Sequence, residues 1–200
     1  MRLVILCLAF ALISCETGNA DISSIPTTPA SKIDTDEANI IDTIFLGYRF
    51  GMSENQFRAH TKNLLKEGVL YQDDKTNLLT YDMVDDSRTV FPTVYSPGYF
   101  RGGMSTLSLS VKCRSSYMNN PVIVTSSIGL MLMEKYRSPS TETKSAICEG
   151  SKNYEWLKGN LHVDLICGFD DARIIYSDLR SKALQDSISE EATKATIDNL

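Results

Sequence analysis

Between residues 39 and 184, hydrophobic and polar positions follow the two periods of regular secondary structure. Leu107, Leu109 and Val111 alternate with polar residues, which is typical of a strand with one buried face. Leu161, which begins another alternating run, shares its face with residues 163, 165 and 167. Together with the turn residues between them, such runs predict further strands at 44–51, 78–84, 89–95, 154–169 and 172–178.

Two segments carry the signals of a helix. Ser53 and Gln56 have the spacing of a capping box, which predicts a helix beginning at this point. Asn120 and Pro121 provide an N-cap and a first-turn proline for a second helix. Because residues 122–125 are all β-branched, a strand is the alternative for the beginning of this second segment.

The order of a helix followed by strands occurs twice. It predicts an α+β domain with helices packed on one face of an antiparallel sheet, in the form of two tandem helix-then-strands halves. Residues 39–184 are expected to form this single domain, since that length is sufficient for a hydrophobic core. Residues 185–200 are polar and are expected to form a C-terminal helix or tail.

The first residues of the chain have a different pattern. Arg2 is followed by an unbroken apolar run from Leu3 to Ile13. At about 1.5 Å per residue, this run has about half the length that a hydrocarbon core of ~30 Å requires. The pattern predicts a signal peptide over residues 1–14. A buried core helix is the alternative, but such a helix is rarely apolar on all its faces.

The four residues that end this run, Leu12-Ile13-Ser14-Cys15, resemble the lipobox of bacterial lipoproteins. The resemblance implies that Cys15 is the lipid attachment residue. In that family the thiol carries a diacylglyceryl group, the chain is cleaved before the cysteine, and the new amine is acylated. Each buried CH₂ of such chains contributes about 0.8 kcal/mol, so several chains hold a protein on a membrane. Ordinary cleavage after Ala20, giving a soluble secreted protein, is the alternative.

Residues 15–38 are rich in Ser, Thr, Asp and Pro, a composition that predicts a flexible tether. Glu16 follows the lipidated position. Among enteric lipoproteins, the absence of Asp at that position resembles an outer-membrane address. The resemblance therefore implies the outer membrane of a Gram-negative bacterium, on either its periplasmic or its surface face.

The charge of the chain limits the classes of partner. The net charge is −5, and removal of residues 1–14 takes away Arg2 and makes it more negative. Nucleic-acid binding requires clustered Lys and Arg, so a nucleic-acid partner is not expected. Docking on anionic lipid through a basic face is disfavoured for the same reason. The membrane contact is therefore assigned to the lipid anchor.

Two further stretches resemble a known class. Residues 50–53, Phe-Gly-Met-Ser, with the helix that follows them, resemble the helix start of small outer-membrane-assembly lipoproteins and of β-lactamase-inhibitor-like repeats. Residues 134–139 resemble the helix exit of the same class, with Arg137 in place of Gly. The resemblance implies a fold that presents a sheet face or loops to a protein partner and has no catalytic centre.

The cysteines suggest a crosslink. Cys7 is removed with the signal peptide and Cys15 carries lipid, which leaves three cysteines in the domain. Cys113 and Cys167 each end an apolar strand face, so they are the expected disulfide pair in an oxidising compartment. Cys148 is then left over, and three free thiols are the alternative.

Residues suited to catalysis or metal binding are few. His60 is expected to flank the core beside Phe57 in the first helix. His162 and Asp164 share a strand face and could lie beside Glu155 or bind a metal, and a solvated polar face is the preferred interpretation. The chain has no hydrolase, zinc-protease, P-loop or dinucleotide motif. We therefore expect no catalytic residue, no metal and no cofactor.

Three acidic pairs lie between predicted strands, at residues 73–74, 85–86 and 170–171. They lack the spacing of a calcium loop. We expect them to be solvated turns.

One stretch is a candidate contact surface. Tyr95, Tyr99, Phe100 and Arg101 surround the Pro-Gly pair of the turn-like sequence Ser-Pro-Gly-Tyr at residues 96–99. Aromatic residues and arginine are common anchors of protein interfaces, so these four residues could form a partner-binding loop. A hairpin whose rings fold back on the sheet is the preferred alternative.

The sequence thus predicts a non-catalytic lipoprotein of the cell envelope that binds a protein or glycan or assists assembly. A small secreted or periplasmic hydrolase or metal-binding protein is the alternative.

Overall fold

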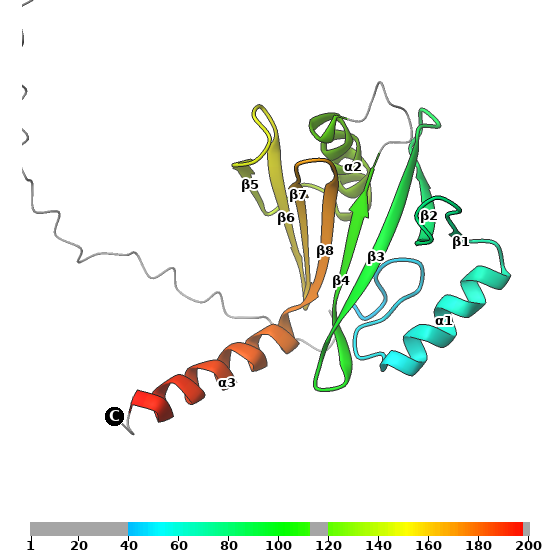
Figure 1. Ribbon diagram of the computed structural model, residues 1–200. Helices are drawn as coiled ribbons and strands as arrows, with labels where there is room; N and C mark the ends of the chain where they lie inside the picture. Colours follow the sequence, from blue (N-terminus) through cyan, green and yellow to red (C-terminus); the bar gives the residue numbers. More distant parts are fainter. Residues whose placement is uncertain (1–39, 113–119, 198–200) are drawn as a thin grey trace, which may run out of the picture. The chain divides into compact units, whose positions relative to one another are not determined.

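The computed structural model describes residues 40–112 and 120–197. Within these ranges a helix and four strands are followed by a second helix and four more strands, and then by a third helix (Figure 1). The elements are α1 Glu54–Lys66, β1 Tyr71–Gln72, β2 Leu79–Val84, β3 Val90–Phe100, β4 Gly103–Val111, α2 Pro121–Tyr136, β5 Thr141–Lys144, β6 Lys152–Lys158, β7 Leu161–Cys167, β8 Ala172–Asp178 and α3 Leu179–Ile197. The lipobox, the tether and Cys113 lie outside the described residues.

The strands form one open antiparallel sheet in the order β1-β2-β3-β4-β8-β7-β6-β5. The last strand of each half, β4 and β8, pair at the centre, and each half continues outward to its own edge strand. The predicted α+β class is confirmed, and so is the arrangement in two helix-then-strands halves.

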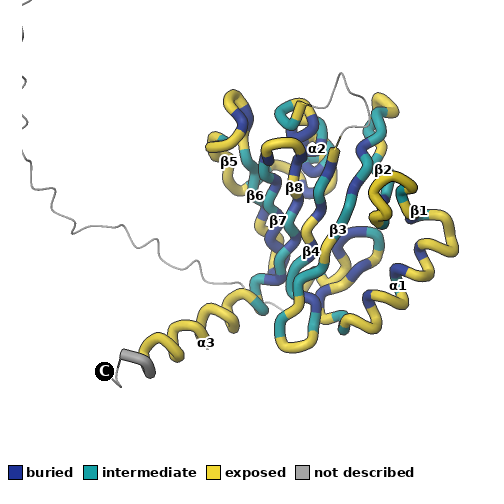
Figure 2. Tube along the Cα trace, viewed as in Figure 1, coloured by how far each residue is buried: buried dark blue, intermediate teal, exposed yellow. Residues whose placement is uncertain are grey.

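The core is centred where the two halves meet. Leu107, Tyr176, Val163 and Trp156 lie opposite one another in register across β4, β8, β7 and β6. Each of these side chains is at most 2% exposed. Helix α2 packs over β7 and β8. Figure 2 shows the buried residues concentrated in the sheet, in α2 and in the segment before α1.

The predicted helix signals are confirmed. The Ser53 hydroxyl accepts a hydrogen bond from the Gln56 backbone N–H, and the Gln56 side chain accepts one from the Ser53 N–H. The Asn120 side chain accepts a hydrogen bond from the Val122 N–H, and Pro121 is the first residue of α2. Residues 122–125 are therefore helical, which excludes the strand alternative.

The strand predicted at residues 44–51 is wrong. Leu46 and Gly47 have φ angles of 51° and 78°, so the chain reverses direction there. The Ile44 N–H donates to the Tyr48 carbonyl across this reversal. Ile44, Phe45, Tyr48 and Phe50 are buried. The hydrophobic pattern thus comes from a buried loop whose side chains pack in the core.

The turn predicted at Ser96–Tyr99 is also wrong, because β3 continues through these residues to Phe100. Strand β2 pairs only with residues 90–94, so the following part of β3 has a neighbouring strand on one side only. A proline is tolerated in such an edge segment, where its missing N–H need not serve a second strand. The actual turn is Arg101-Gly102, with φ angles of 51° and 80°.

Two other predicted boundaries differ. The single strand expected at 154–169 is a hairpin of β6 and β7 that turns at Gly159 and Asn160. Strand β5, a polar and fully exposed edge strand, has no hydrophobic signal in the sequence. Charged side chains such as Glu142 and Lys144 on an edge strand oppose pairing with another chain.

The C-terminal segment forms a helix. Helix α3 begins directly after β8, and its residues 182–194 are all exposed (Figure 2). Because α3 contacts the sheet only near its start, the expectation that the helices pack on one face of the sheet stays a prediction. Across the described ranges, none of the helices combines the length and the apolar character needed to cross a membrane.

Candidate binding site

The end of the β3–β4 hairpin and the start of α3 enclose a hollow of about 250 Å³. We call it the hairpin hollow. Figure 1 shows the hairpin turn and the start of α3 at the same end of the sheet. The hairpin side contributes Phe100 and Arg101, and the Arg101 guanidinium lies 5.7 Å from the centre of the Phe100 ring. The helix side contributes Arg180 and Leu184.

A buried carboxylate fixes the helix side of this hollow. Asp178 accepts hydrogen bonds from Arg180 Nε at 3.0 Å and from Asn160 Nδ2 at 3.1 Å. Burial by itself would raise the pKa of Asp178, but these hydrogen bonds outweigh it and the pKa lies below its ordinary value. Arg180 also donates to Asp42 at 3.1 Å. Its guanidinium is therefore held in place by two carboxylates.

Asn160 connects the same end of the domain to the segment before α1. The Ile41 N–H donates to Asn160 Oδ1 at 2.6 Å, and Asn160 Nδ2 donates to the Ile41 carbonyl at 3.2 Å. The side chain is 4% exposed and spans Ile41 and Asp178. The first described residues of the domain thus lie beside the start of α3.

The four residues of the predicted partner-binding loop do not act as one group. Tyr95 and Tyr99 fold back onto Phe57 of α1, with ring centres 6.1 Å and 6.5 Å away. The Phe57 ring also stacks on the buried ring of Tyr48 at 4.6 Å. Burial raises the pKa of the Tyr48 phenol far above its ordinary value. Of the four residues, only Phe100 and Arg101 line the hollow. The two tyrosine rings do fold back onto the domain, but the helix α1 receives them.

The disulfide predicted between Cys113 and Cys167 is wrong. Cys167, at the end of β7, is bonded to Cys148 in the loop between β5 and β6. The Cys148 N–H donates to the Ser145 hydroxyl, a contact that folds this loop on itself. Because the strand pattern shows where apolar faces end but not where a polar loop returns, sequence reasoning left Cys148 as the unpaired residue.

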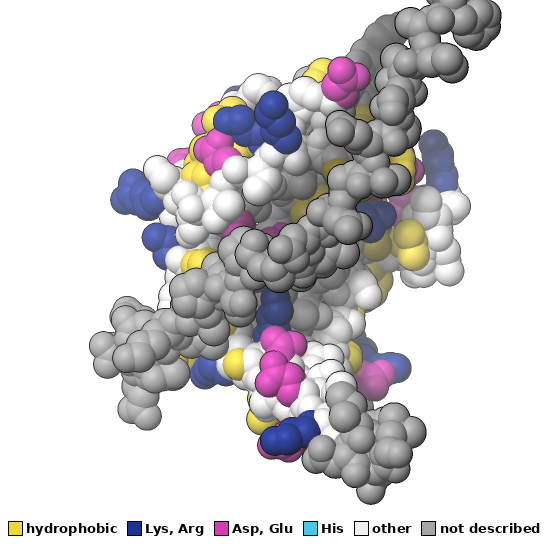
Figure 3. Space-filling view, turned by 90° about the vertical axis from the view of Figure 1, so that its left-hand side faces the viewer, with side chains coloured by type: hydrophobic (Ala, Val, Ile, Leu, Met, Phe, Trp, Pro, Cys, Tyr) yellow, Lys and Arg dark blue, Asp and Glu magenta, His cyan; other side chains and the backbone are white. Residues whose placement is uncertain are grey.

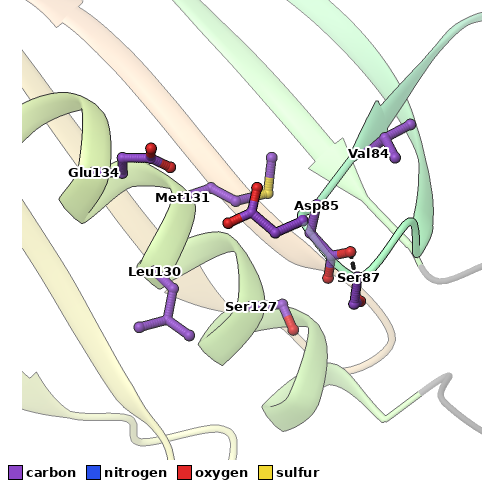
Figure 4. Close-up of a pocket in the computed structure, with 8 residues that line it drawn as sticks. Val84, Asp85, Ser87, Ser127, Leu130, Met131 and Glu134 are labelled. Carbon is purple, nitrogen blue, oxygen red and sulfur yellow. Dashed lines mark hydrogen bonds between the residues drawn. The ribbon is translucent and has the colours of Figure 1, made fainter.

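A second hollow, of about 380 Å³, lies between α2 and the β2–β3 turn (Figure 4). In Figure 4, Ser127 and Met131 of α2 point toward the turn that carries Asp85 and Ser87, whereas Leu130 points away from it. Its carboxylates include Asp85, which accepts hydrogen bonds from Ser87 and from the Thr89 N–H. These bonds hold the pKa of Asp85 below its ordinary value.

Asp73 lies at the start of another turn and accepts hydrogen bonds from the Lys75 and Thr76 N–H groups. Its pKa is lowered mainly by the bonds from Thr76. Asp73 and Asp85 thus both serve as turn residues, as the sequence predicts for their acidic pairs.

The histidines occupy different environments. His60 Nε2 lies 2.8 Å from the Leu46 carbonyl oxygen, and its ring edge contacts Tyr48. This is the predicted position beside the core. His162 lies on β7 with Asp164, and Glu155 of β6 is beside them. The three residues share one sheet face as expected, but His162 is only 8% exposed, so the preferred interpretation of a solvated polar face is wrong for this residue.

Comparisons of this chain with family models, with curated proteins and with solved structures found no match.

Proposed function

We propose that this chain is a lipid-anchored, non-catalytic binding module of the outer membrane of a Gram-negative bacterium. Acyl chains on Cys15 hold it on the membrane, and the hairpin hollow binds an envelope protein. The lipobox-like residues 12–15 and the polar segment that follows them support the anchor. The observation that carries the binding role is the pairing of an aromatic ring, Phe100, with an exposed arginine, Arg101, at a hairpin end beside a hollow.

The chemistry of the hollow favours one kind of partner segment. Phe100 and Leu184 offer apolar surface, and Leu184 is 42% exposed. Arg180 is already engaged by Asp42 and Asp178, whereas Arg101 is exposed at the turn. A partner segment that carries an apolar side chain next to a carboxylate would contact the apolar surface and Arg101 at the same time. Arginine and aromatic residues concentrate the binding energy of such interfaces.

The charge distribution supports a protein partner over a nucleic acid. On the face of the molecule drawn in Figure 3, Lys and Arg side chains are interspersed with Asp and Glu over the described surface. A nucleic-acid site would gather basic residues into a continuous patch. The net charge of −5 points the same way.

The binding role is tested by crosslinking in the native envelope. A photo-reactive residue is placed at position 101 in one strain and at position 88 in another. Arg88 is the matched control, because it also has a positive φ in a hairpin turn and lies at the other end of β3. We expect a crosslinked envelope protein at position 101 and not at 88. In addition, Arg101→Glu should reduce co-purification of that protein about tenfold or more, with an unchanged melting temperature.

Equal crosslinking at the two positions would refute the hairpin hollow as the binding site. Crosslinks to glycan alone would replace the protein partner by a glycan.

The anchor is tested separately by mass spectrometry of the mature protein from membranes. We expect an acylated N-terminus at Cys15, and a free N-terminus at Asp21 would refute it.

A further inference from the structure

Three potential metal ligands meet on strands β6 and β7, and none of them lines the hairpin hollow. Glu155 lies directly opposite Asp164 in the register of the two strands. His162 precedes Asp164 by two positions, so both side chains project from the same face of β7. One ligand atom from each residue lies within 4.8 Å of the other two. We call these three residues the β6–β7 cluster.

The geometry of the cluster is that of groups facing a common point. His162 Nε2 lies 2.8 Å from Glu155 Oε1 and 3.3 Å from Asp164 Oδ1. His162 is 8% exposed, and its Nε2 atom is buried with no hydrogen bond to a partner in the described part of the chain. Both carboxylates are therefore close to this nitrogen.

Electrostatics at the cluster favour a cation. Two carboxylates face one imidazole, so the cluster carries two negative charges when His162 is neutral. The surroundings thus stabilise positive charge at this point of the sheet.

We propose that Glu155, His162 and Asp164 form a binding site for a zinc-like divalent cation. With zinc–nitrogen and zinc–oxygen bonds of about 2.0–2.2 Å, tetrahedral ligands lie roughly 3.3 Å apart. The distance of 3.3 Å between His162 Nε2 and Asp164 Oδ1 already fits this value. The distance of 2.8 Å between His162 Nε2 and Glu155 Oε1 needs to widen by only about 0.5 Å.

The donor set also discriminates between cations. An imidazole nitrogen suits zinc and its neighbours among the first-row metals, whereas Ca²⁺ and Mg²⁺ prefer oxygen ligands alone. A hollow of about 180 Å³ adjoins Glu155 and Asp164 and is lined also by Asn153, Thr141 and Thr143. It gives a bound cation access to water as a fourth ligand.

The test is zinc titration of the full chain in detergent, purified through a tag without histidine and stripped with a chelator. Isothermal titration calorimetry at neutral pH with zinc chloride is expected to show one tight site. The half-buried ligands allow isosteric variants, Glu155→Gln and Asp164→Asn. Loss of an outer-shell partner costs 10–100-fold in metal affinity, so loss of a direct ligand should cost about a hundredfold or more. Glu134→Gln is the matched control, because Glu134 lines the hollow between α2 and the β2–β3 turn. This variant should bind zinc normally.

Two further measurements make the outcome specific. Cobalt in place of zinc should give the visible absorption bands of a low-symmetry four-coordinate site, and excess Ca²⁺ should not displace it. Far-ultraviolet circular dichroism should be identical for the three variants. The proposal is overturned if the wild-type chain binds zinc no more tightly than the Glu155→Gln and Asp164→Asn variants. It is also overturned if Glu134→Gln weakens binding as much as they do.

Discussion

The disulfide between Cys148 and Cys167 leads to a quantitative prediction about stability. The bond closes a loop between residues separated by 19 positions. In the chain-entropy model, closing a loop of this length in the unfolded state stabilises the folded protein by about 3 kcal/mol at 25 °C. The double variant Cys148→Ala/Cys167→Ala should lose about this amount. For a domain near 150 residues, the melting temperature should fall by roughly 6–12 °C.

Urea unfolding followed by tryptophan fluorescence measures this loss, because the single tryptophan, Trp156, is fully buried on β6. The matched control is Cys113→Ala, which leaves the Cys148–Cys167 bond intact. Amide hydrogen exchange adds a local readout. The bond ties the loop before β6 to the end of β7, so protection in the β5–β6 hairpin should fall further than protection in β4 and β8.

The results that would refute this reasoning are specific. A loss of less than about 1 kcal/mol in the double variant would show that the loop is already ordered without the crosslink. An equal loss in Cys113→Ala, with a peptide joining Cys113 and Cys167 in a non-reducing digest, would restore the pairing expected from the sequence.

Two other predictions concern the end of the domain near the hairpin hollow. Asn160→Ala removes the bonds to the Ile41 backbone and to Asp178, and at about 0.5–1.5 kcal/mol for a neutral bond and more for a charged one it should destabilise by roughly 2–4 kcal/mol in urea unfolding. A loss below about 0.5 kcal/mol would mean that water replaces these bonds without cost. The lowered pKa of Asp178 means that its ion pair stabilises the protein fully above the unfolded-state pKa of about 3.9, and that this contribution is lost as the pH falls through the lower folded-state pKa. Stability measured from about pH 5 to pH 3 should therefore fall less steeply in Asp178→Asn than in the wild type, and parallel curves would contradict this assignment.

Local signals in the sequence were sufficient for the helices and the central strands. The Ser53 capping box and the Asn120-Pro121 pair specify where α1 and α2 begin, because the bonds that cap a helix join residues two or three positions apart. The alternation along β4 and β7 likewise identifies the buried face of each strand. The α+β class and the repeated order of elements follow from these local patterns.

The candidate sites depended on contacts that sequence order does not record. Arg101 and Arg180 line one hollow although 78 residues of sequence separate them, because β4 pairs with β8 and brings the hairpin end to the start of α3. The β6–β7 cluster depends in the same way on the strand register that sets Glu155 opposite Asp164. His162 and Asp164 could be assigned to one strand face in advance, but their distance from Glu155 could not.

The sequence alone thus determined the elements whose signals lie within a few neighbouring residues: helix caps, strand alternation and turns made by single carboxylates such as Asp73 and Asp85. Only the tertiary structure decided the partner of Cys167, the reversal at Gly47 and the extended conformation of Pro97. The physical reason is that burying an apolar side chain is equally favourable in free energy in a strand or in a folded loop. Hydrophobicity therefore does not specify the path of the backbone. That path is set by which distant segments pack together.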